Sequence, residues 1–247
     1  MTDSSPAFQR VLAIETATRY QAVALLDGDQ LLEHRIQRVR YNHGSSLLGN
    51  IDHLLLAQAV EVADIDLFCV GLGPGSFTGL RVGLATAKAL ARATNRPIVG
   101  VSSLAALAQG AARTHPKATI LAAIDARRRE VYAAAYRWSE GQLQCVLDAC
   151  ALSPARWRAR VEEDVTGPLI QIGDGVPRYA DLAEWAGVTT IPQALAPPSA
   201  VSVALLGRQK ARAQGPADLI SLEPDYIRPS DARLPDRPLR SIPELDE

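Results

Sequence analysis

The chain carries one short pattern twice, once at the start of each half, and this repeat limits the folds available to it more than any other feature. An apolar run ends in an acidic residue and a turn in "VLAIETATR", beginning at Val11, and again in "ILAAIDARR", beginning at Ile120. An apolar run of this length before a turn is typical of a buried strand. Two such halves predict an α/β protein with two similar lobes.

The elements expected after each copy support this reading. In the first half we expect strands at 11–16, 22–26, 31–39, 66–71 and "RPIVGV", and helices at 43–60, 77–94 and 102–112. In the second half we expect two strands joined by a turn within 118–138, a further segment at 142–147, a strand at 169–172, and helices at 154–163 and 176–185. The Pro-rich "IPQALAPPSA" is typical of a linker, and a helix at 200–213 should pack back on the first half.

Duplicated lobes of this kind are the architecture of actin, Hsp70 and the sugar kinases. The fold class we predict is therefore the actin-like/Hsp70-like (ASKHA) two-lobed α/β fold, with a mixed sheet and packed helices in each lobe. The first lobe should comprise residues 1–110, completed by the helix within 198–214, and the smaller second lobe residues 111–197. Residues 215–247 should form a C-terminal segment and a loosely held tail.

Composition narrows the function classes. The chain has 247 residues, of which 47% are hydrophobic, and its 26 basic and 27 acidic side chains leave a net charge of −1. A dedicated nucleic-acid binder usually has a strong basic excess. Cys69, Cys145 and Cys150 show no C-x-x-C spacing and suggest reduced, buried thiols. With no signal peptide or apolar run of membrane-spanning length, we expect a cytoplasmic protein without a membrane partner.

The stretch "GLGPGSFTGLRVGLATAKALA", from residue 71 to 91, resembles a phosphate-binding loop but fails each specific test. A P-loop needs a lysine directly after its glycines, and Lys88 lies in the middle of the helix. A dinucleotide fingerprint needs a third glycine where Thr78 stands. A serine-hydrolase elbow needs G-x-S-x-G, whereas Ser76 lies in G-S-x-x-G. The plainer interpretation is that both hydroxyls cap the helix.

The helix after these glycines has a strip of small residues at four-residue spacing: Gly79, Gly83, Ala87 and Ala91. Such a strip lets another element approach closely, either within its own lobe or in a partner subunit. We favour the partner, because this helix and the helix at 47–55 have more small or aliphatic residues than one sheet face can cover. On this interpretation Gly83→Arg should abolish pairing and leave the monomer folded.

Five blocks of sequence resemble the TsaB (YeaZ) family: "LAIETAT", "GPGSFTGLRVG", "PIVGVSSL", "AAIDARRREVY" and "PDYIRPSDAR". The resemblance spans residues 11 to about 233. It implies a non-catalytic scaffold in the bacterial complex that places threonylcarbamoyl on the adenosine beside the tRNA anticodon. The implied partners are the catalytic paralogue TsaD, the ATPase TsaE and the donor-forming TsaC, with a homodimer when the chain is alone and tRNA contacted only through the complex.

The expected partner interface lies on the two helices and the glycine loop. Its members are Leu47, Leu48, Ile51, Leu55, Gly73, Pro74, Gly75, Ser76, Phe77, Thr78, Gly79, Leu80, Gly83 and Ala87.

The resemblance also implies that no metal, ATP or other cofactor is bound by this subunit itself, and that ATP, Mg²⁺ and a metal ion belong to the partners. The catalytic paralogue carries a His-x-x-x-His pair, two imidazoles on one helical face. Aligning "PIVGVSSLAAL" with that element puts Ser103 and Leu107 at the two ligand positions. His43 and His53 are ten residues apart, too far to replace them.

Two turns could either contact a nucleotide or serve only to hold the fold together. Glu15 and Thr16 end the first repeat, and Asp125 and Arg127 end the second. An acid before a turn is commonly structural, and we expect an Asp–Arg pair to brace the second turn.

Two alternative functions stay open at this point. One is an ATP-dependent phosphotransferase or hydrolase of the actin-like class that uses the interlobe cleft. The other is a serine peptidase with Ser76 as its nucleophile, although no histidine is spaced to serve as the base.

Overall fold

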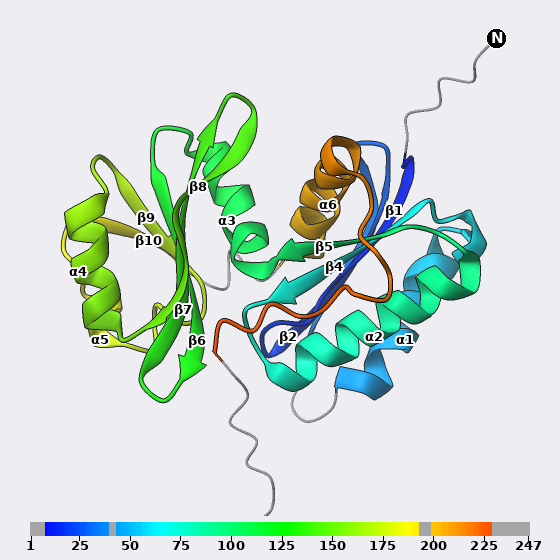
Figure 1. The fold of residues 1–247 in the computed structure, drawn as a ribbon, viewed down its shortest axis with the longest axis horizontal. Coiled ribbons are helices and arrows are strands. Elements are labelled where there is room, and N and C mark those ends of the chain that lie inside the picture. Colours follow the sequence, from blue (N-terminus) through cyan, green and yellow to red (C-terminus); the bar gives the residue numbers. More distant parts are fainter. Residues whose placement is uncertain (1–7, 40–42, 193–198, 229–247) are drawn as a thin grey trace, which may run out of the picture.

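Two five-stranded sheets with one shared topology form the two lobes of the molecule (Figure 1). In this computed structural model, residues 8–39, 43–192 and 199–228 are described. The first sheet contains β1 (Arg10–Glu15), β2 (Tyr20–Asp27), β3 (Gln30–Arg38), β4 (Leu67–Gly73) and β5 (Ile98–Ser102). The second contains β6 (Thr119–Arg127), β7 (Glu130–Ser139), β8 (Gln142–Leu152), β9 (Leu169–Ile172) and β10 (Val188–Ile191).

The repeat seen in the sequence is a structural duplication. The first sheet has the order β3-β2-β1-β4-β5, and the second has the matching order β8-β7-β6-β9-β10. In both sheets the leading strand pairs antiparallel with the next strand and parallel with the fourth. The predicted two-lobed, mixed-sheet fold is confirmed.

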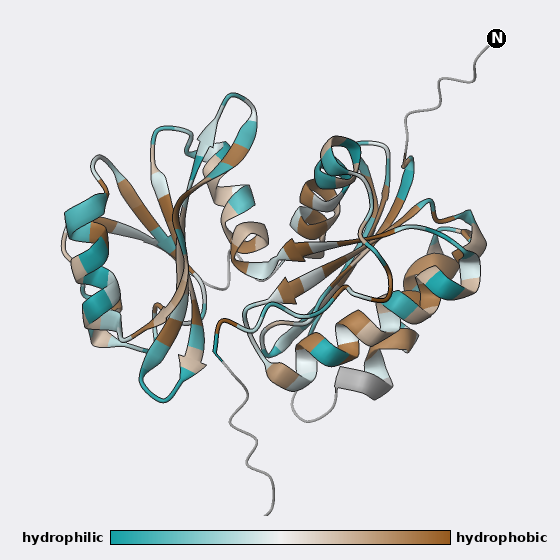
Figure 2. Cartoon of the chain, viewed as in Figure 1, coloured by the Kyte–Doolittle hydropathy of each residue, from teal (hydrophilic) through white to brown (hydrophobic). Residues whose placement is uncertain are grey.

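Helices cover both faces of each sheet. They are α1 (His43–Ala57), the short 3₁₀ helix η1 (Val62–Asp64), α2 (Phe77–Thr94), α3 (Ser103–Thr114), α4 (Pro154–Asp164), α5 (Ala180–Ala183) and α6 (Ala200–Gln214). In the first lobe, α1 and α2 bury their apolar faces on one side of the sheet and α6 covers the other. In the second lobe, α3 packs on one face, and α4 and α5 on the other. Hydrophobic residues gather along the strands and the inward helix faces (Figure 2).

The element predictions hold except in the second half. Helix 77–94 and strand 169–172 are found with the expected bounds. The helix expected at 176–185 is a single turn, 180–183, and the edge strand β10 was not foreseen. Its central residues, Thr189 and Thr190, are exposed and polar, so no apolar run marks it. No described helix is long and apolar enough to span a membrane.

The lobe boundary predicted at residue 110 falls within α3, a helix that contacts both lobes. It buries Leu104, Leu107 and Ala111 against the second sheet, while Ala106 packs in the core of the first lobe. The expected linker falls largely on residues 193–198, outside the described residues. Helix α6 returns to the first lobe as predicted, where Val203 and Ala204 are fully buried.

The cysteines match the sequence expectation only in part. Cys69 is buried on β4, Cys150 is half-buried and Cys145 is exposed, and all three are free thiols. Burial raises the pKa of the Cys69 thiol, which leaves it protonated and unreactive.

The C-terminal segment of residues 215–228 is tied along the first lobe and ends at the second. The Ala217 amide donates to the Ile98 carbonyl at 2.9 Å, and the Asp225 amide donates to the Leu72 carbonyl at 2.8 Å. Arg228 then reaches the second lobe, where it pairs with Glu130 at 2.8 Å. The rest of the expected loose tail lies outside the described residues.

Helix α2 begins directly against the turn that joins β1 and β2. A Cβ atom at Gly75 would lie 2.2 Å from the Ala17 carbonyl oxygen, and one at Gly79 would lie 2.2 Å from that of Thr16. At Gly83 it would lie 2.2 Å from Thr16 Oγ1, and this hydroxyl donates a hydrogen bond to the Gly79 carbonyl at 2.8 Å. The small-residue strip therefore packs within its own lobe, and the expectation that it faces a partner is wrong.

This contact predicts that Gly83→Ala lowers the free energy of unfolding by about 1–3 kcal/mol, because the new methyl group must displace Thr16. Denaturant unfolding measures the change. As a control, Gly110→Ala adds the same methyl on α3, where nothing lies within 4 Å, and should stabilise by about 0.5–1 kcal/mol. A gain at Gly83 equal to that at Gly110 would contradict the packing.

Candidate functional site

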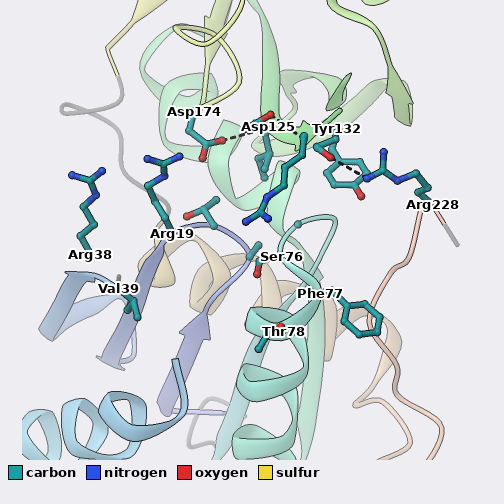
Figure 3. A pocket seen from close by; sticks show the side chains of 16 residues that line it. Arg19, Arg38, Val39, Ser76, Phe77, Thr78, Asp125, Tyr132, Asp174 and Arg228 are labelled. Carbon is teal, nitrogen blue, oxygen red and sulfur yellow. Dashed lines mark hydrogen bonds between the residues drawn. The ribbon is translucent and has the colours of Figure 1, made fainter. Parts of the chain in front are cut away.

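A hollow of about 660 Å³ lies between the two lobes (Figure 3). The first lobe contributes the β1–β2 turn, the end of β3 and the start of α2, and the second contributes mainly the β6–β7 hairpin. Its lining comprises residues 17–19, 38–39, 75–78 and 124–127, with Tyr132, Asp174 and Arg228. Both copies of the sequence repeat thus meet at this cleft, each through the turn that follows its acidic residue.

The acid of the second repeat, Asp125, is fully engaged in holding its own hairpin. Its Oδ1 accepts hydrogen bonds from the Arg127 amide and the Tyr179 hydroxyl, both at 2.9 Å. Its Oδ2 pairs with Arg178 Nε at 2.9 Å. The expected brace exists, but it acts through the backbone of Arg127 and not through its guanidinium group.

The hairpin that Asp125 braces has an unusual backbone. Arg127, Arg128 and Arg129 have φ values of 60°, 52° and 63°, all in the left-handed region that side-chain-bearing residues seldom adopt. The hairpin places Arg127 in the lining of the cleft.

Asp174 is a second carboxylate at the cleft, and no motif in the sequence pointed to it. Its Oδ1 accepts a hydrogen bond from the Asp125 amide at 3.0 Å. Burial raises its pKa, and the nearby Asp125 charge raises it further, while the Asp125 amide and Arg19 act in the opposite direction. Figure 3 shows Arg19 reaching from the first lobe toward Asp174.

The acid of the first repeat does not face the cleft. Glu15 is buried beneath Gly71, and its Oε1 accepts a hydrogen bond from the Ala17 amide at 2.7 Å. Its Oε2 has no hydrogen-bond partner among the described residues. Thr16 is also buried, with its hydroxyl bonded to α2. The alternative in which these side chains contact a nucleotide is wrong, because neither lines the cleft.

The donor set of the cleft does not fit a magnesium–nucleotide complex. A magnesium ion requires oxygen ligands, mainly carboxylates and water. Glu15 is buried away from the cleft, Asp125 is paired with Arg178, and Asp174 already accepts a hydrogen bond from the Asp125 amide. Among the described residues, no group of three or more His, Cys, Asp or Glu side chains could hold a metal ion.

The two positions aligned with the histidine pair of the catalytic paralogue are buried in the lobe junction. Ser103 Oγ accepts a hydrogen bond from the Gly73 amide at 3.2 Å, and Leu107 packs in the core beneath the second sheet. Both side chains therefore serve the packing of α3.

Ser76 acts as a helix cap. Its Oγ accepts a hydrogen bond from the Gly79 amide at 3.3 Å, as expected for the residue before α2. No histidine is found among the described residues that line the cleft, so no imidazole there would take the proton from this hydroxyl.

The expected partner surface divides into a buried and an exposed part. The members buried within their own lobe are Leu47, Ile51, Leu55, Gly73, Pro74, Gly79, Leu80, Gly83 and Ala87. For these the expectation of an exposed face is wrong. Leu48, Phe77 and Thr78 are exposed, and Gly75 and Ser76 are half-buried.

An apolar groove of about 460 Å³ follows the outer face of α1. Leu48 and Leu56, which are 57% and 69% exposed, lie two helical turns apart with Asp52 between them. Val62 of η1 and Leu90 of α2 line the other side. Leu56 was missed in the sequence, because a helix so rich in leucine does not show from its pattern alone which of them face solvent.

Comparisons with known proteins agree with the fold. The family model described as "TsaD: tRNA N6-adenosine threonylcarbamoyltransferase" matches residues 37–179. The chain is 34% identical over 180 residues to "tRNA threonylcarbamoyladenosine biosynthesis protein TsaB" of Escherichia coli, covering 72% of this chain and 77% of that protein. It is 31% identical to the Bacillus subtilis protein of the same name, covering 90% and 95%.

Solved structures give the same answer. "YeaZ from Pseudomonas aeruginosa" aligns with a TM-score of 0.75 at 29% identity, over 88% of this chain and 99% of that one. Component A of (R)-2-hydroxyglutaryl-CoA dehydratase from Acidaminococcus fermentans shares the fold alone, with a TM-score of 0.51 at 13% identity over 82% and 99%. The protein is thus of the actin-like, two-lobed class. Within that class, the chain belongs to the TsaB (YeaZ) family.

The buried Glu15 predicts a pH-dependent stability. Burial raises its pKa, partly offset by the Ala17 amide, the Ser103 side chain and the Thr16 amide. Above the ordinary glutamate pKa of about 4.3, the unfolded chain releases this proton while the folded chain keeps it. Wild-type stability should therefore fall as the pH rises from about 4 toward neutrality, relative to Glu15→Gln.

Urea unfolding of both proteins at several pH values measures this difference. Glu163→Gln, which replaces an exposed glutamate on α4, serves as the control. A stability difference between wild type and Glu15→Gln that stays constant from pH 4 to pH 8 would show that Glu15 is ionised in the folded chain.

Proposed function

We propose that this chain is a non-catalytic subunit in the synthesis of tRNA threonylcarbamoyladenosine, and that it acts by binding and activating a catalytic subunit of the TsaD type. We further propose that the chain works in the cytoplasm, that TsaE and TsaC are further components of the system, and that the chain forms a homodimer when TsaD is absent. The observation that carries it is membership of the TsaB family, whose Escherichia coli and Bacillus subtilis members are named for this pathway.

The chemistry of the cleft supports a non-catalytic role. Asp125 is committed to its hairpin, Glu15 is buried, and Ser76 caps a helix without a base beside it. These are the groups that a phosphotransferase or a serine peptidase of this fold would need free. The chain therefore retains the two-lobed scaffold while its candidate reactive groups serve the fold.

The outer face of α1 is the surface that best fits the partner. Leu48 and Leu56 are large, exposed and on one helical face, and the groove beside them is apolar. Contiguous apolar surface that the lobe itself leaves open is typical of an interface core. Asp52 and Glu61 add two acidic side chains to the lining of this groove.

The likeness to the TsaD family supports TsaD as the occupant. The matched region, 37–179, includes α1, α2 and the groove between them. A partner with the same fold carries the corresponding helix pair, so two such faces can pair about a pseudo-two-fold axis. A second copy of this chain would use the same face, which explains why a homodimer and the complex with TsaD would exclude each other.

The test replaces the two exposed leucines. Leu48→Arg/Leu56→Arg should weaken binding to TsaD from the same organism at least about tenfold, because two charges replace the centre of an apolar contact. Calorimetric titration measures binding, and tRNA modification by the reconstituted system should fall with it. Both positions are exposed, so the melting temperature of the isolated chain should change little.

The matched control is Leu31→Arg/Val146→Arg, which places two arginines at exposed apolar positions on β3 and β8. It should bind TsaD as the wild type does. If the Leu48/Leu56 variant binds TsaD and supports modification as well as this control, the proposed docking face is wrong. If omission of the whole chain leaves modification unchanged, the proposed function itself is wrong.

A further inference from the structure

The cleft between the lobes has a positive charge that the proposed docking on α1 does not use. Four arginines line it: Arg19, Arg38 and Arg127, with Arg228 from the C-terminal segment. The carboxylates that line it are Asp125 and Asp174.

Two of these four arginines have an acidic partner, and two do not pair with any described residue. Arg228 pairs with Glu130, and Asp125 pairs with Arg178, which stands outside the lining. Arg19 interacts with Asp174. The Arg38 and Arg127 guanidinium groups have no ion pair or hydrogen bond to any described residue. One comes from each lobe, and both line the same hollow.

An exposed aromatic pair lies at the edge of this basic cleft. Phe77 lines it and is 38% exposed, and Tyr226 is equally exposed, with their ring centroids 5.4 Å apart. The Arg81 guanidinium lies 3.8 Å from the centroid of the Phe77 ring and donates to the Tyr226 hydroxyl at 3.0 Å. Aromatic faces beside arginines are what single-stranded nucleic acids use for base stacking and backbone contact.

We propose that the interlobe cleft binds a single-stranded RNA segment, with Arg38 and Arg127 on its phosphates and the exposed part of the Phe77 ring as an apolar contact for a base at the edge. The inference deepens the proposed function, on which it rests for the choice of RNA, by giving this chain a direct contact with the RNA substrate. A free nucleotide offers the same phosphate chemistry. RNA fits better, because both carboxylates of the cleft already have partners, Asp125 in Arg178 and Asp174 in the Asp125 amide, while a basic groove with an exposed aromatic suits a phosphodiester strand.

Because the net charge of the chain is close to zero, we expect its affinity for RNA to be low. A local patch of a few arginines gives weak binding that depends strongly on salt, unlike that of a basic RNA-binding domain. In the assembled complex such a contact would add to those made by other subunits.

The test uses the isolated full chain and a fluorescently labelled single-stranded oligoribonucleotide of about ten nucleotides. Anisotropy at low salt should detect binding. Arg38→Gln/Arg127→Gln should raise Kd at least about tenfold, and should reduce the slope of log K against log salt by about 0.7 for each phosphate that an arginine no longer neutralises. Phe77→Ala should also weaken binding, by about fivefold or more.

The control is Arg92→Gln/Arg156→Gln, which removes one exposed arginine from each lobe away from the cleft, at the far end of α2 and on α4. It should bind RNA as the wild type does. Equal weakening in both double variants would show nonspecific attraction and would overturn the proposal.

Two further outcomes would also overturn it. In the first, the wild type does not bind RNA. In the second, the wild type binds ATP or ADP through Arg38 and Arg127 but does not bind RNA, which would identify the cleft as a nucleotide site. Binding of the cleft variant to TsaD is measured in parallel and should be unchanged. A failure of RNA binding with intact TsaD binding removes this inference and leaves the proposed function standing.

Discussion

The contact between the start of α2 and the β1–β2 turn is the constraint on which the rest of the first lobe depends. With no Cβ at Gly75, Gly79 or Gly83, the helix approaches until its carbonyl accepts the Thr16 hydroxyl and its preceding loop meets Ala17. Tight packing of this kind fixes position because neither side can shift without a clash. The contact therefore fixes the position of residues 17–19 and 75–78, which line the interlobe cleft from the first lobe.

The first lobe has two distinct open surfaces, the outer face of α1 and the wall of the interlobe cleft. On α1, which packs beside α2, opposite helical faces carry the aliphatic residues, so that Leu54 is fully buried and Leu56 is largely exposed. The outer face of α1 then offers an apolar groove, while the cleft on the other side of the α2 N-terminus offers arginines and Phe77. The start of α2 thus lies at the cleft, while Leu90 near its other end lies at the groove of α1.

Much of the fold could be predicted from the sequence, because the apolar runs and the repeated turn are local signals. The equal strand orders of the two sheets follow from that repeat. The partner of the glycine strip could not be predicted, since small residues at four-residue spacing look alike whether they meet a strand turn or another subunit. The burial of Glu15 and the arginine cluster of the cleft depend on long-range packing, as when Arg228 crosses to Glu130.

The central claim is that α1 meets the partner while the glycines of α2 serve their own lobe. Hydrogen–deuterium exchange of the chain, alone and with TsaD, tests it most directly. We expect exchange to slow along α1 and η1 when TsaD is added, while the amides from Gly79 to Gly83 are already protected in the isolated chain. Rapid exchange at Gly79–Gly83 in the free chain that slows on binding, with α1 unchanged, would contradict the account.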